Sequence, residues 1–413
     1  MNQIFDEISK KSAEELRIKY IEEFNPTGNY EGIKAITFDG LDRGALKTKC
    51  FAYIGFPQNS NNAKVPAVVL IHGGAGYPFL QWVKEWTNRG YAAIALSTIG
   101  VFPLRINAGD VEGALEKDWT HELTGVFYED GYTSTPDNDD MRIRDTQPID
   151  DMWMYHAVSQ TILAGKVLES FDVVDNNKIG AVGISWGSVI LSITLGYKNN
   201  FAYAIPVYGS GYLTESLSYM RYKFILPRVQ DLWLAEKNFN NVKIPVLWIC
   251  MNNDSCFSAN SNSKSYIYTV KNNARTTLSI KSGWIHGHSC CWDINYPCKE
   301  IYAFADAMVG EGSFPYIEKL ELSDDGMICA KYAEIPHDDV AATLYYLTEQ
   351  YEYAIPLNMH ESHIAHNWKK KRAFVDRKNR IVRVNVPSNA TVCYLEIVDK
   401  RNNLTVSSIF LNP

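Results

Sequence analysis

The stretch KIGAVGISWGSVILSI, residues 178–193, decides which fold this sequence predicts. Its first half is a short apolar run typical of a buried strand, and its second half has the periodicity of a helix. At the junction, residues 183–187 fit the pattern G-x-S-x-G. The two glycines leave room for a cramped turn that presents the serine between them. The sequence therefore predicts that Ser185 lies on a sharp turn from strand to helix.

Segments on both sides of this junction alternate between strands and helices. Residues 65–71 form an apolar run that ends in glycines, as a strand buried on both faces does. We predict further strands at 91–98, 203–209, 244–254 and 276–288, and helices at 78–90, 150–170, 186–198 and 299–310. This alternation favours a doubly wound, mostly parallel sheet with helices on both faces. With the G-x-S-x-G turn, it predicts the α/β-hydrolase fold.

The remaining segments extend this framework. An amphipathic helix over 4–24 and a strand pair at 33–38 and 46–56 are expected before the first buried strand. Residues 99–149 and 211–240 interrupt the alternation, and we interpret them as walls or lids of a substrate cleft, with surface decoration as the alternative. After residue 314, short alternating segments predict a β-sandwich. The expected domains are therefore 1–313, catalytic, and 314–413, an immunoglobulin-like sandwich.

Composition and charge limit the classes of partner. The 413 residues carry a net charge of −7, with 46% hydrophobic and 21% charged residues, as a globular protein does. The one basic run, residues 369–372, is interpreted as a solvated loop, so no nucleic-acid partner is expected. No stretch approaches the ~18 apolar residues of a membrane span. The sequence does not determine the oligomeric state, and a homo-oligomer is one possibility.

The expected compartment follows from the N-terminus and the cysteines. The first 24 residues are charged throughout and lack the apolar core of a signal peptide, so we expect a cytoplasmic protein with no membrane partner. The eight cysteines show no paired framework and are expected to be free thiols.

A nucleophile and its oxyanion donors can be assigned from the turns that follow the strands. Ser185 precedes a helix N-terminus, which favours negative charge developing beside it. The backbone N–H of Trp186 is one expected oxyanion donor, and an amide near Gly74 or Ala75 in HGGAG (72–76) is the second. His72 in that loop is expected to hold the loop in place.

An acid and a histidine must follow the nucleophile in the order Ser, Asp, His. Asp254 ends the strand at 244–254, where such an acid is expected, with an ordinary turn aspartate as the alternative. His286 and His288 come next, and we favour His286 as the base while His288 stays open. No further ligand accompanies the two histidines, so we expect no metal, and the chemistry requires no cofactor.

Aromatic residues near these motifs are candidates for stacking on sugar rings, with core packing as an equally good alternative. The substrate-binding candidates are Tyr77, Trp284 and Trp292, and Phe79 and Trp186 belong to the same group.

The segments VPAVVLIHGGAG, GISWGS, PVLWICMNND, HGHSCCW and EIYAFAD together resemble the acetyl xylan esterase and dienelactone hydrolase-like α/β-hydrolases. The likeness spans about residues 50–310 and is to bacterial members that end in a small β-sandwich. It implies a serine carboxylester hydrolase with Ser185, Asp254 and one of His286 or His288 in the triad positions. The implied substrate is an acetylated carbohydrate of the xylo-oligosaccharide kind, or a small acetyl ester.

Two other functions share these sequence features. A serine peptidase of the prolyl oligopeptidase kind uses the same triad, but such enzymes carry a large N-terminal propeller, and here the first buried strand begins near residue 65. A catalytically inactive hydrolase fold used for binding usually lacks a triad member, and this chain has candidates for all three. We therefore favour the esterase.

Overall fold

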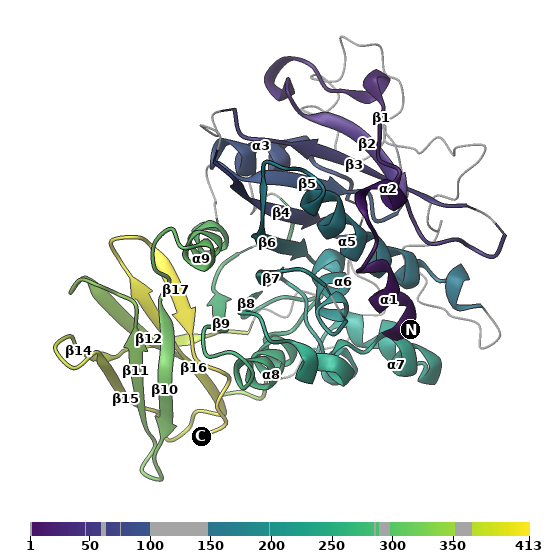
Figure 1. The fold of residues 1–413 in the computed structure, drawn as a ribbon. Coiled ribbons are helices and arrows are strands. Elements are labelled where there is room, and N and C mark those ends of the chain that lie inside the picture. Colours follow the sequence, from purple (N-terminus) through teal and green to yellow (C-terminus); the bar gives the residue numbers. More distant parts are fainter. Residues whose placement is uncertain are drawn as a thin grey trace.

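The computed structural model describes residues 2–45, 47–58, 63–74, 76–99, 148–197, 199–284, 286–288, 298–351 and 366–413. Its main feature is a nine-stranded sheet in the order β1-β2-β3-β5-β4-β6-β7-β8-β9 (Figure 1). The strands are β1 (Lys19–Tyr20), β2 (Lys34–Asp39), β3 (Lys49–Gly55), β4 (Val65–Ile71), β5 (Ala92–Leu96), β6 (Val174–Ile184), β7 (Tyr203–Val207), β8 (Leu247–Met251) and β9 (Thr277–Lys281). Strands β4 to β9 all run parallel, and β1 to β3 extend the sheet through antiparallel pairs. The predicted mostly parallel sheet is confirmed.

Helices cover both faces of this sheet. One face packs against α1 (Asn2–Ile8), α2 (Ala13–Leu16), α5 (Trp153–Glu169), α6 (Trp186–Thr194), α7 (Pro227–Trp233) and α8 (Ala259–Val270), and the other against α3 (Leu80–Asn88) and α9 (Lys299–Val309). Short 3-10 helices lie at η1 (Glu22–Phe24), η2 (Gly28–Tyr30), η3 (Ile149–Asp151), η4 (Leu213–Glu215), η5 (Tyr219–Phe224) and η6 (Ala235–Asn241). Strand β4 shows why both faces are covered, because its side chains alternate and are apolar on each face. Val69 packs in the core on the first face, Val68 and Leu70 pack in the core on the second, and all three are fully buried.

The N-terminal segment differs from the single amphipathic helix predicted over 4–24. Helix α1 ends at Ile8, and α2 starts separately because Ser12 and Glu15 form a capping box. Arg17 then adopts a left-handed conformation with φ 47°, and β1 pairs with β2. The prediction of one helix was wrong because a local cap and pairing with the sheet interrupt it.

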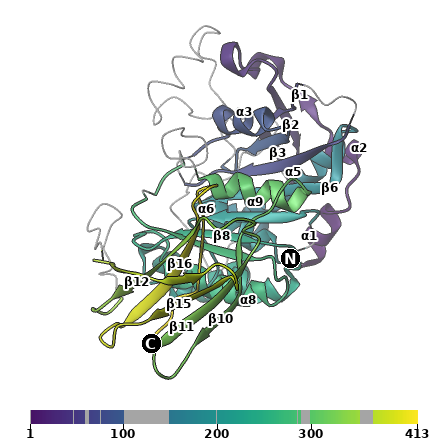
Figure 2. The same ribbon diagram turned by 90° about the vertical axis from the view of Figure 1, so that its left-hand side faces the viewer.

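The C-terminal residues form two four-stranded antiparallel sheets that share a core (Figure 2). One sheet has the order β10-β11-β15-β14 and the other β13-β12-β16-β17. The strands are β10 (Tyr316–Leu322), β11 (Met327–Ala333), β12 (Val340–Leu347), β13 (Lys369–Arg372), β14 (Phe374–Asp376), β15 (Ile381–Asn385), β16 (Val392–Asp399) and β17 (Leu404–Ser407). We call this unit the C-terminal sandwich. The two sheets agree with the predicted β-sandwich. The boundary at 313/314 and the immunoglobulin-like topology stay predictions.

The basic run is not the solvated loop that was predicted. Residues 369–372 form β13, the edge strand beside β12, with all four residues exposed. A strand can carry four charged residues at a sheet edge because that edge faces water, and such charges oppose pairing with other chains.

The two inserts have different outcomes. Residues 100–147 of the insert predicted at 99–149 lie outside the described residues. Residues 211–240 form η4, η5, α7 and η6, and their side chains enter the core through Phe224, Val229 and Trp233, all buried. The ring of Phe224 lies 6.0 Å from that of Trp186, next to the predicted nucleophile. This insert therefore packs beside the Ser185 turn, and its role as a cleft wall stays a prediction.

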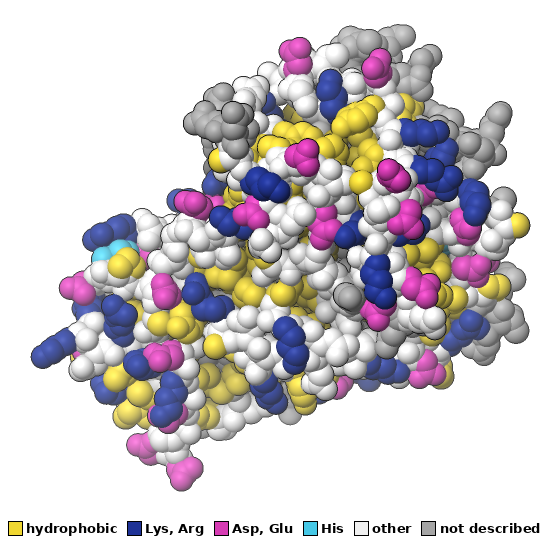
Figure 3. Space-filling view, in the orientation of Figure 1, with side chains coloured by type: hydrophobic (Ala, Val, Ile, Leu, Met, Phe, Trp, Pro, Cys, Tyr) yellow, Lys and Arg dark blue, Asp and Glu magenta, His cyan; other side chains and the backbone are white. Residues whose placement is uncertain are grey.

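The outer surface shows no segregation of charge on the face drawn in Figure 3, where basic and acidic side chains are interspersed. Among the helices of the described residues, none has the length and apolar character needed to cross a membrane.

Candidate active site

The turn at Ser185 has the backbone strain that a sharp strand-to-helix junction requires. Ser185 follows β6 and precedes α6 with φ 55° and ψ −118°, a conformation that is costly for a residue with a side chain. Its N–H donates to the carbonyl of Val207 over 2.8 Å, which fixes the turn against β7. A Cβ on Gly187 would collide with the carbonyl oxygen of Ile71, so only glycine fits there. Ser185 itself is partly exposed.

The sheet order explains why a glycine loop lies beside this serine. Strand β4 lies between β5 and β6 in the sheet. The chain leaves β4 toward β5 on one side and continues with β6 on the other side, so the strand order reverses at β4. Ligands bind at such a switch point in open α/β sheets. A Cβ built on Gly73, just after β4, would lie 2.8 Å from Cβ of Ser185. The loop and the serine turn are therefore packed directly together.

Ser185, His286 and Asp254 form one continuous hydrogen-bonded chain. Oγ of Ser185 lies 2.8 Å from Nε2 of His286, and Nδ1 of His286 lies 2.9 Å from Oδ2 of Asp254. Because a carboxylate only accepts, Nδ1 carries the proton and Nε2 is the acceptor for the serine hydroxyl. Ser185 follows β6, Asp254 follows β8 and His286 follows β9. Parallel strands place their carboxyl ends at one edge of the sheet, which brings the three residues together.

Asp254 is held rigidly after β8. The carboxylate is buried, and its Oδ1 accepts the N–H groups of Cys256 and Phe257 over 2.8 and 3.1 Å. These bonds leave Oδ2 directed at His286. A buried carboxylate held by hydrogen bonds to its charged form is suited to orient an imidazole.

His286 contacts two aromatic rings that sequence reasoning missed. The ring of Phe257 stacks on it with centroids 5.9 Å apart, and the ring of Tyr208 lies 5.2 Å away. Burial alone lowers the pKa of His286, but the charge and hydrogen bond of Asp254 outweigh burial, so its pKa is raised above the ordinary value. Tyr208 directly follows β7 and adopts φ 60°. Its one sequence signal was its place at a strand end, just before Gly209.

His288 takes a different position from His286. Its Nε2 accepts the backbone N–H of Gly73 over 2.9 Å, and its ring lies 5.0 Å from that of Phe79. Burial, followed by the charges of His72 and His286, lowers its pKa to about 3. The structure therefore places His288 against the glycine loop as a neutral hydrogen-bond acceptor.

His72 fixes the other side of the same loop. Its Nδ1 donates to the carbonyl of Gly73 over 2.7 Å, and its Nε2 accepts the N–H of Thr98 over 3.0 Å. Burial lowers its pKa to about 4, so the ring is neutral. The expectation that His72 holds the loop is confirmed.

The predicted oxyanion donors have unequal support. Helix α6 begins at Trp186, so the N–H of Trp186 lies in a first turn, where N–H groups have no intrahelical acceptor. Gly74 packs on the indole of Trp186, where an added Cβ would come within 2.8 Å of Cδ1. Ala75 lies outside the described residues. The amide of Gly73 is already bonded to His288, which leaves Gly74 as the described candidate from this loop.

The aromatic candidates are distributed between the core and the site. Trp186 is buried, with the ring of Trp153 5.3 Å away in an edge-on contact. Tyr77 is buried with Phe79, their centroids 4.1 Å apart, which fits the core-packing alternative. Trp284 is half-buried near Lys281. Trp292 lies outside the described residues, and a substrate-binding role for any of them stays a prediction.

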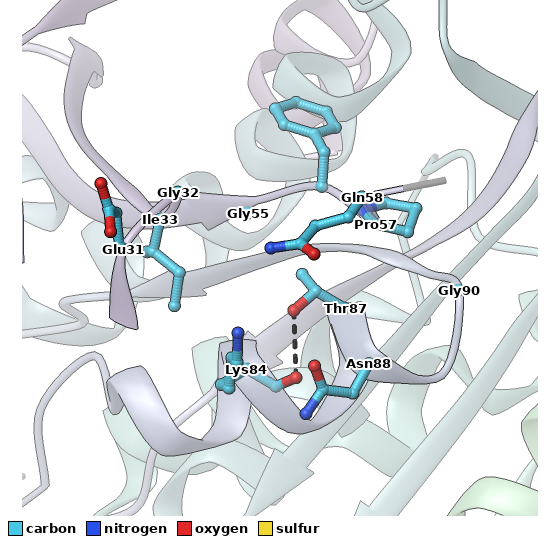
Figure 4. A pocket seen from close by; sticks show the side chains of 11 residues that line it. Glu31, Gly32, Ile33, Gly55, Pro57, Gln58, Lys84, Thr87, Asn88 and Gly90 are labelled. Atoms are coloured by element: carbon cyan, nitrogen blue, oxygen red, sulfur yellow. Dashed lines mark hydrogen bonds between the residues drawn. The ribbon is translucent and has the colours of Figure 1, made fainter. Parts of the chain in front are cut away.

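A polar pocket of about 300 Å³ lies elsewhere in the fold, between the β2–β3 side of the sheet and α3 (Figure 4). Gln58 lies on one side of it, with Lys84, Thr87 and Asn88 on the other. Gly90, in its lining, precedes β5. The pocket is therefore at the edge where parallel strands begin, opposite the edge that carries Ser185.

Among the described residues, one trio could hold a metal ion: Asp254, Cys256 and His286, with ligand atoms within 4.8 Å of one another. Two of these atoms are already hydrogen-bonded together. The donor set fits a carboxylate–imidazole pair better than a metal centre.

The comparisons with solved structures give distant similarities. The acetyl xylan esterase from Paenibacillus sp. R4 is 14% identical, with a TM-score of 0.49, over 74% of this chain and 92% of that one. The acetyl xylan esterase 1 from Thermoanaerobacterium sp. JW/SL YS485 is 13% identical, with a TM-score of 0.43, over 75% and 95%. The Pyrococcus horikoshii acylaminoacyl peptidase is 14% identical, with a TM-score of 0.47, over 68% of this chain. The chain spans only 42% of that peptidase.

Comparison with sequence families is more direct. No curated protein matches the chain. The model of the dienelactone hydrolase family matches residues 51–300, which include the Ser185 turn, Asp254 and both histidines. This match covers more than half of the sequence. The protein belongs to the dienelactone hydrolase family.

Proposed function

We propose that the protein is a serine carboxylester hydrolase with Ser185 as nucleophile, His286 as general base and Asp254 as the group that orients the base. One observation carries the proposal: the chain from Oγ of Ser185 through His286 to Asp254, with both distances below 3.0 Å. A serine hydroxyl is a weak nucleophile, and a hydrogen-bonded imidazole activates it by accepting its proton.

Each proton has a defined place in the proposed reaction. Oγ of Ser185 attacks the ester carbonyl carbon while its proton passes to Nε2 of His286. Asp254 stabilises the imidazolium, and the N–H of Trp186, with an amide near Gly74, accommodates the oxyanion. His286 then protonates the departing alcohol, which leaves an acyl group on Ser185. Water attacks the acyl-enzyme, again giving its proton to His286, and the acid is released.

We infer that the acyl group is acetyl and that the alcohol is a carbohydrate of the xylo-oligosaccharide kind or another small alcohol. Trp186 adjoins the proposed nucleophile, and its buried ring contacts those of Phe224 and Trp153, so an aromatic cluster lies next to the Ser185 turn. An aromatic wall suits a short acyl chain and the apolar face of a sugar.

The test is acetate release from acetylated xylo-oligosaccharides by the wild type and by Ser185→Ala. Loss of a triad nucleophile lowers kcat on the order of 10³-fold or more. A matched control is Ser192→Ala, which removes a serine hydroxyl from the same helix where it bonds only the backbone of Ser188. Near-normal turnover by Ser185→Ala would refute the nucleophile.

The outcomes separate the classes of function. If the wild type cleaves an activated acetyl ester but not the oligosaccharide, the triad stands and the carbohydrate is rejected. If a serine-directed phosphonate does not label Ser185 in the wild type, the fold serves for binding and the proposal fails. Cleavage of peptide substrates in preference to esters would indicate a peptidase.

A further inference from the structure

The C-terminal sandwich reaches the turn that carries Asp254. The indole Nε1 of Trp368, just before β13, lies 3.3 Å from the carbonyl oxygen of Asn252 and 3.1 Å from Oδ1 of Asn253. The side chain of Asn252 donates to the hydroxyl of Tyr394, on β16, over 3.1 Å. Asn252 is the first residue after β8. Sandwich side chains therefore bind the two residues that immediately precede the acid.

These contacts are embedded in a buried aromatic cluster. The ring of Trp368 lies 5.2 Å from that of Tyr394, which stacks on Tyr345 with centroids 4.9 Å apart and planes 3° apart. Alternate residues of β12 and β16 divide between two cores: Tyr345 and Tyr394 pack with the hydrolase, while Leu344 faces the sandwich interior. This sheet is thus buried on both faces, which makes the attachment rigid.

A second attachment lies at the strand that leads to His286. The N–H of Ile280, on β9, donates to Oγ of Ser407, on β17, over 3.0 Å. Lys281, the last residue of β9, forms a buried ion pair with Glu300 of α9. The same carboxylate accepts the N–H of Thr405 over 2.8 Å. Figure 1 shows β17 beside β9.

We propose that the C-terminal sandwich is part of the catalytic apparatus, with Trp368 and Tyr394 as positioning residues that set the place of Asp254 against His286. The inference rests on the proposed triad. The bonds are to the turn that carries Asp254, and Asn252 and Tyr394 are both buried, so moving the turn would break hydrogen bonds between buried polar groups. Catalytic groups need such support from the residues behind them.

Two stacked tyrosines provide a matched test. Tyr394→Phe removes the hydroxyl bonded to Asn252, whereas Tyr345→Phe removes a hydroxyl that contacts Glu396 and Ser282 and not the turn that carries Asp254. The two residues are direct partners across β12 and β16, so both changes take one oxygen from the same sheet. Trp368→Phe removes the indole N–H as an independent second variant.

The variants are compared with the wild type by kcat and KM on an activated acetyl ester, by the pH profile and by thermal unfolding. We expect Tyr394→Phe and Trp368→Phe to lower kcat on the order of 10-fold, since small misplacement of catalytic groups is costly. KM should stay within about twofold, because the substrate contacts are untouched. The kinetic pKa of His286 should fall, because a displaced Asp254 supports the imidazolium less well. Tyr345→Phe should keep the wild-type kcat and profile.

The inference is overturned if Tyr394→Phe and Trp368→Phe change only the unfolding temperature, with kcat and pH profile equal to those of Tyr345→Phe. The sandwich is then merely attached. Failure of the proposed function looks different, because the wild type itself would neither hydrolyse the ester nor be labelled at Ser185.

Discussion

The backbone N–H of Gly73 donates to Nε2 of His288, a bond between residues 215 positions apart in the sequence. It joins the glycine loop after β4 to the loop after β9, one residue beyond the His286–Gly287 pair. His288 thereby holds the glycine loop, while His286 is hydrogen-bonded to Ser185, the proposed nucleophile. The two neighbouring histidines therefore make different contacts, and mutating each one tests its role separately.

We expect His286→Gln to lower kcat on the order of 10³-fold, as loss of a triad member does. His288→Gln should retain activity, since the amide oxygen of glutamine replaces Nε2 as an acceptor for Gly73. His288→Ala should fall between them, because the buried Gly73 N–H loses its partner. Steady-state kinetics of the three variants give the ranking. Equal losses in His286→Gln and His288→Gln would contradict the separate roles.

The pH dependence of kcat/KM should follow the raised pKa of His286. The base acts in its neutral form, so activity falls as the pH is lowered through this pKa, which lies above the ordinary value of about 6.5. Asp254→Asn should move the acidic limb to lower pH while reducing the maximal rate, since the carboxylate charge is what raises the pKa. A profile that stays flat down to pH 5 in the wild type would exclude a histidine base.

Acid should destabilise the fold through His72 and His288, whose pKa values are lowered to about 4 and about 3. Below a pH of about 6.5 the unfolded chain binds protons at these positions while the folded chain does not. Their contribution to stability is therefore complete above that pH and is lost progressively as the pH falls toward 4 and 3. Chemical unfolding at pH 7.5 and 4.5 measures the loss. His288→Gln, which has no titratable group, should show a smaller one.

The serine turn should tolerate no added methyl group at Gly187. Gly187→Ala places a Cβ against the carbonyl oxygen of Ile71, at the end of β4, so we expect loss of stability or of folding. Gly287→Ala is the matched control, since a Cβ there meets open space at an ordinary φ. Comparing the unfolding temperatures of the two variants decides the point, and equal values would show that the turn is less crowded than described.

Much of the hydrolase framework was predictable because its signals are local. The apolar run at 65–71 and the junction at Ser185 each fix a strand or a turn from neighbouring residues, and β4, β6 and α6 appear where expected. The N-terminal helix was mispredicted because Ser12 caps a second helix and Tyr20 pairs with Ile36. Pairing of that kind depends on tertiary contact, which periodicity does not contain.

The site was predictable in its residue types and less so in its contacts. The order of Ser185, Asp254 and His286 follows from strand ends, which the sequence marks. The bond between His288 and Gly73 and the stacking of Phe257 on His286 depend on loops that meet only in three dimensions. Nothing in the local sequence of Trp368 indicates that its indole binds the turn before Asp254.

The contact between Trp368 and Asn252 joins residues that are 116 positions apart, so they are synthesised at different times. A growing chain releases Asn252 from the ribosome well before Trp368 is made, and domains fold as they emerge. The partially synthesised protein therefore holds the proposed nucleophile, base and acid before Trp368 and Tyr394 can contact the turn that carries Asp254. With the proposed positioning role, the site is completed late in biosynthesis, when the strands of the C-terminal sandwich have been made.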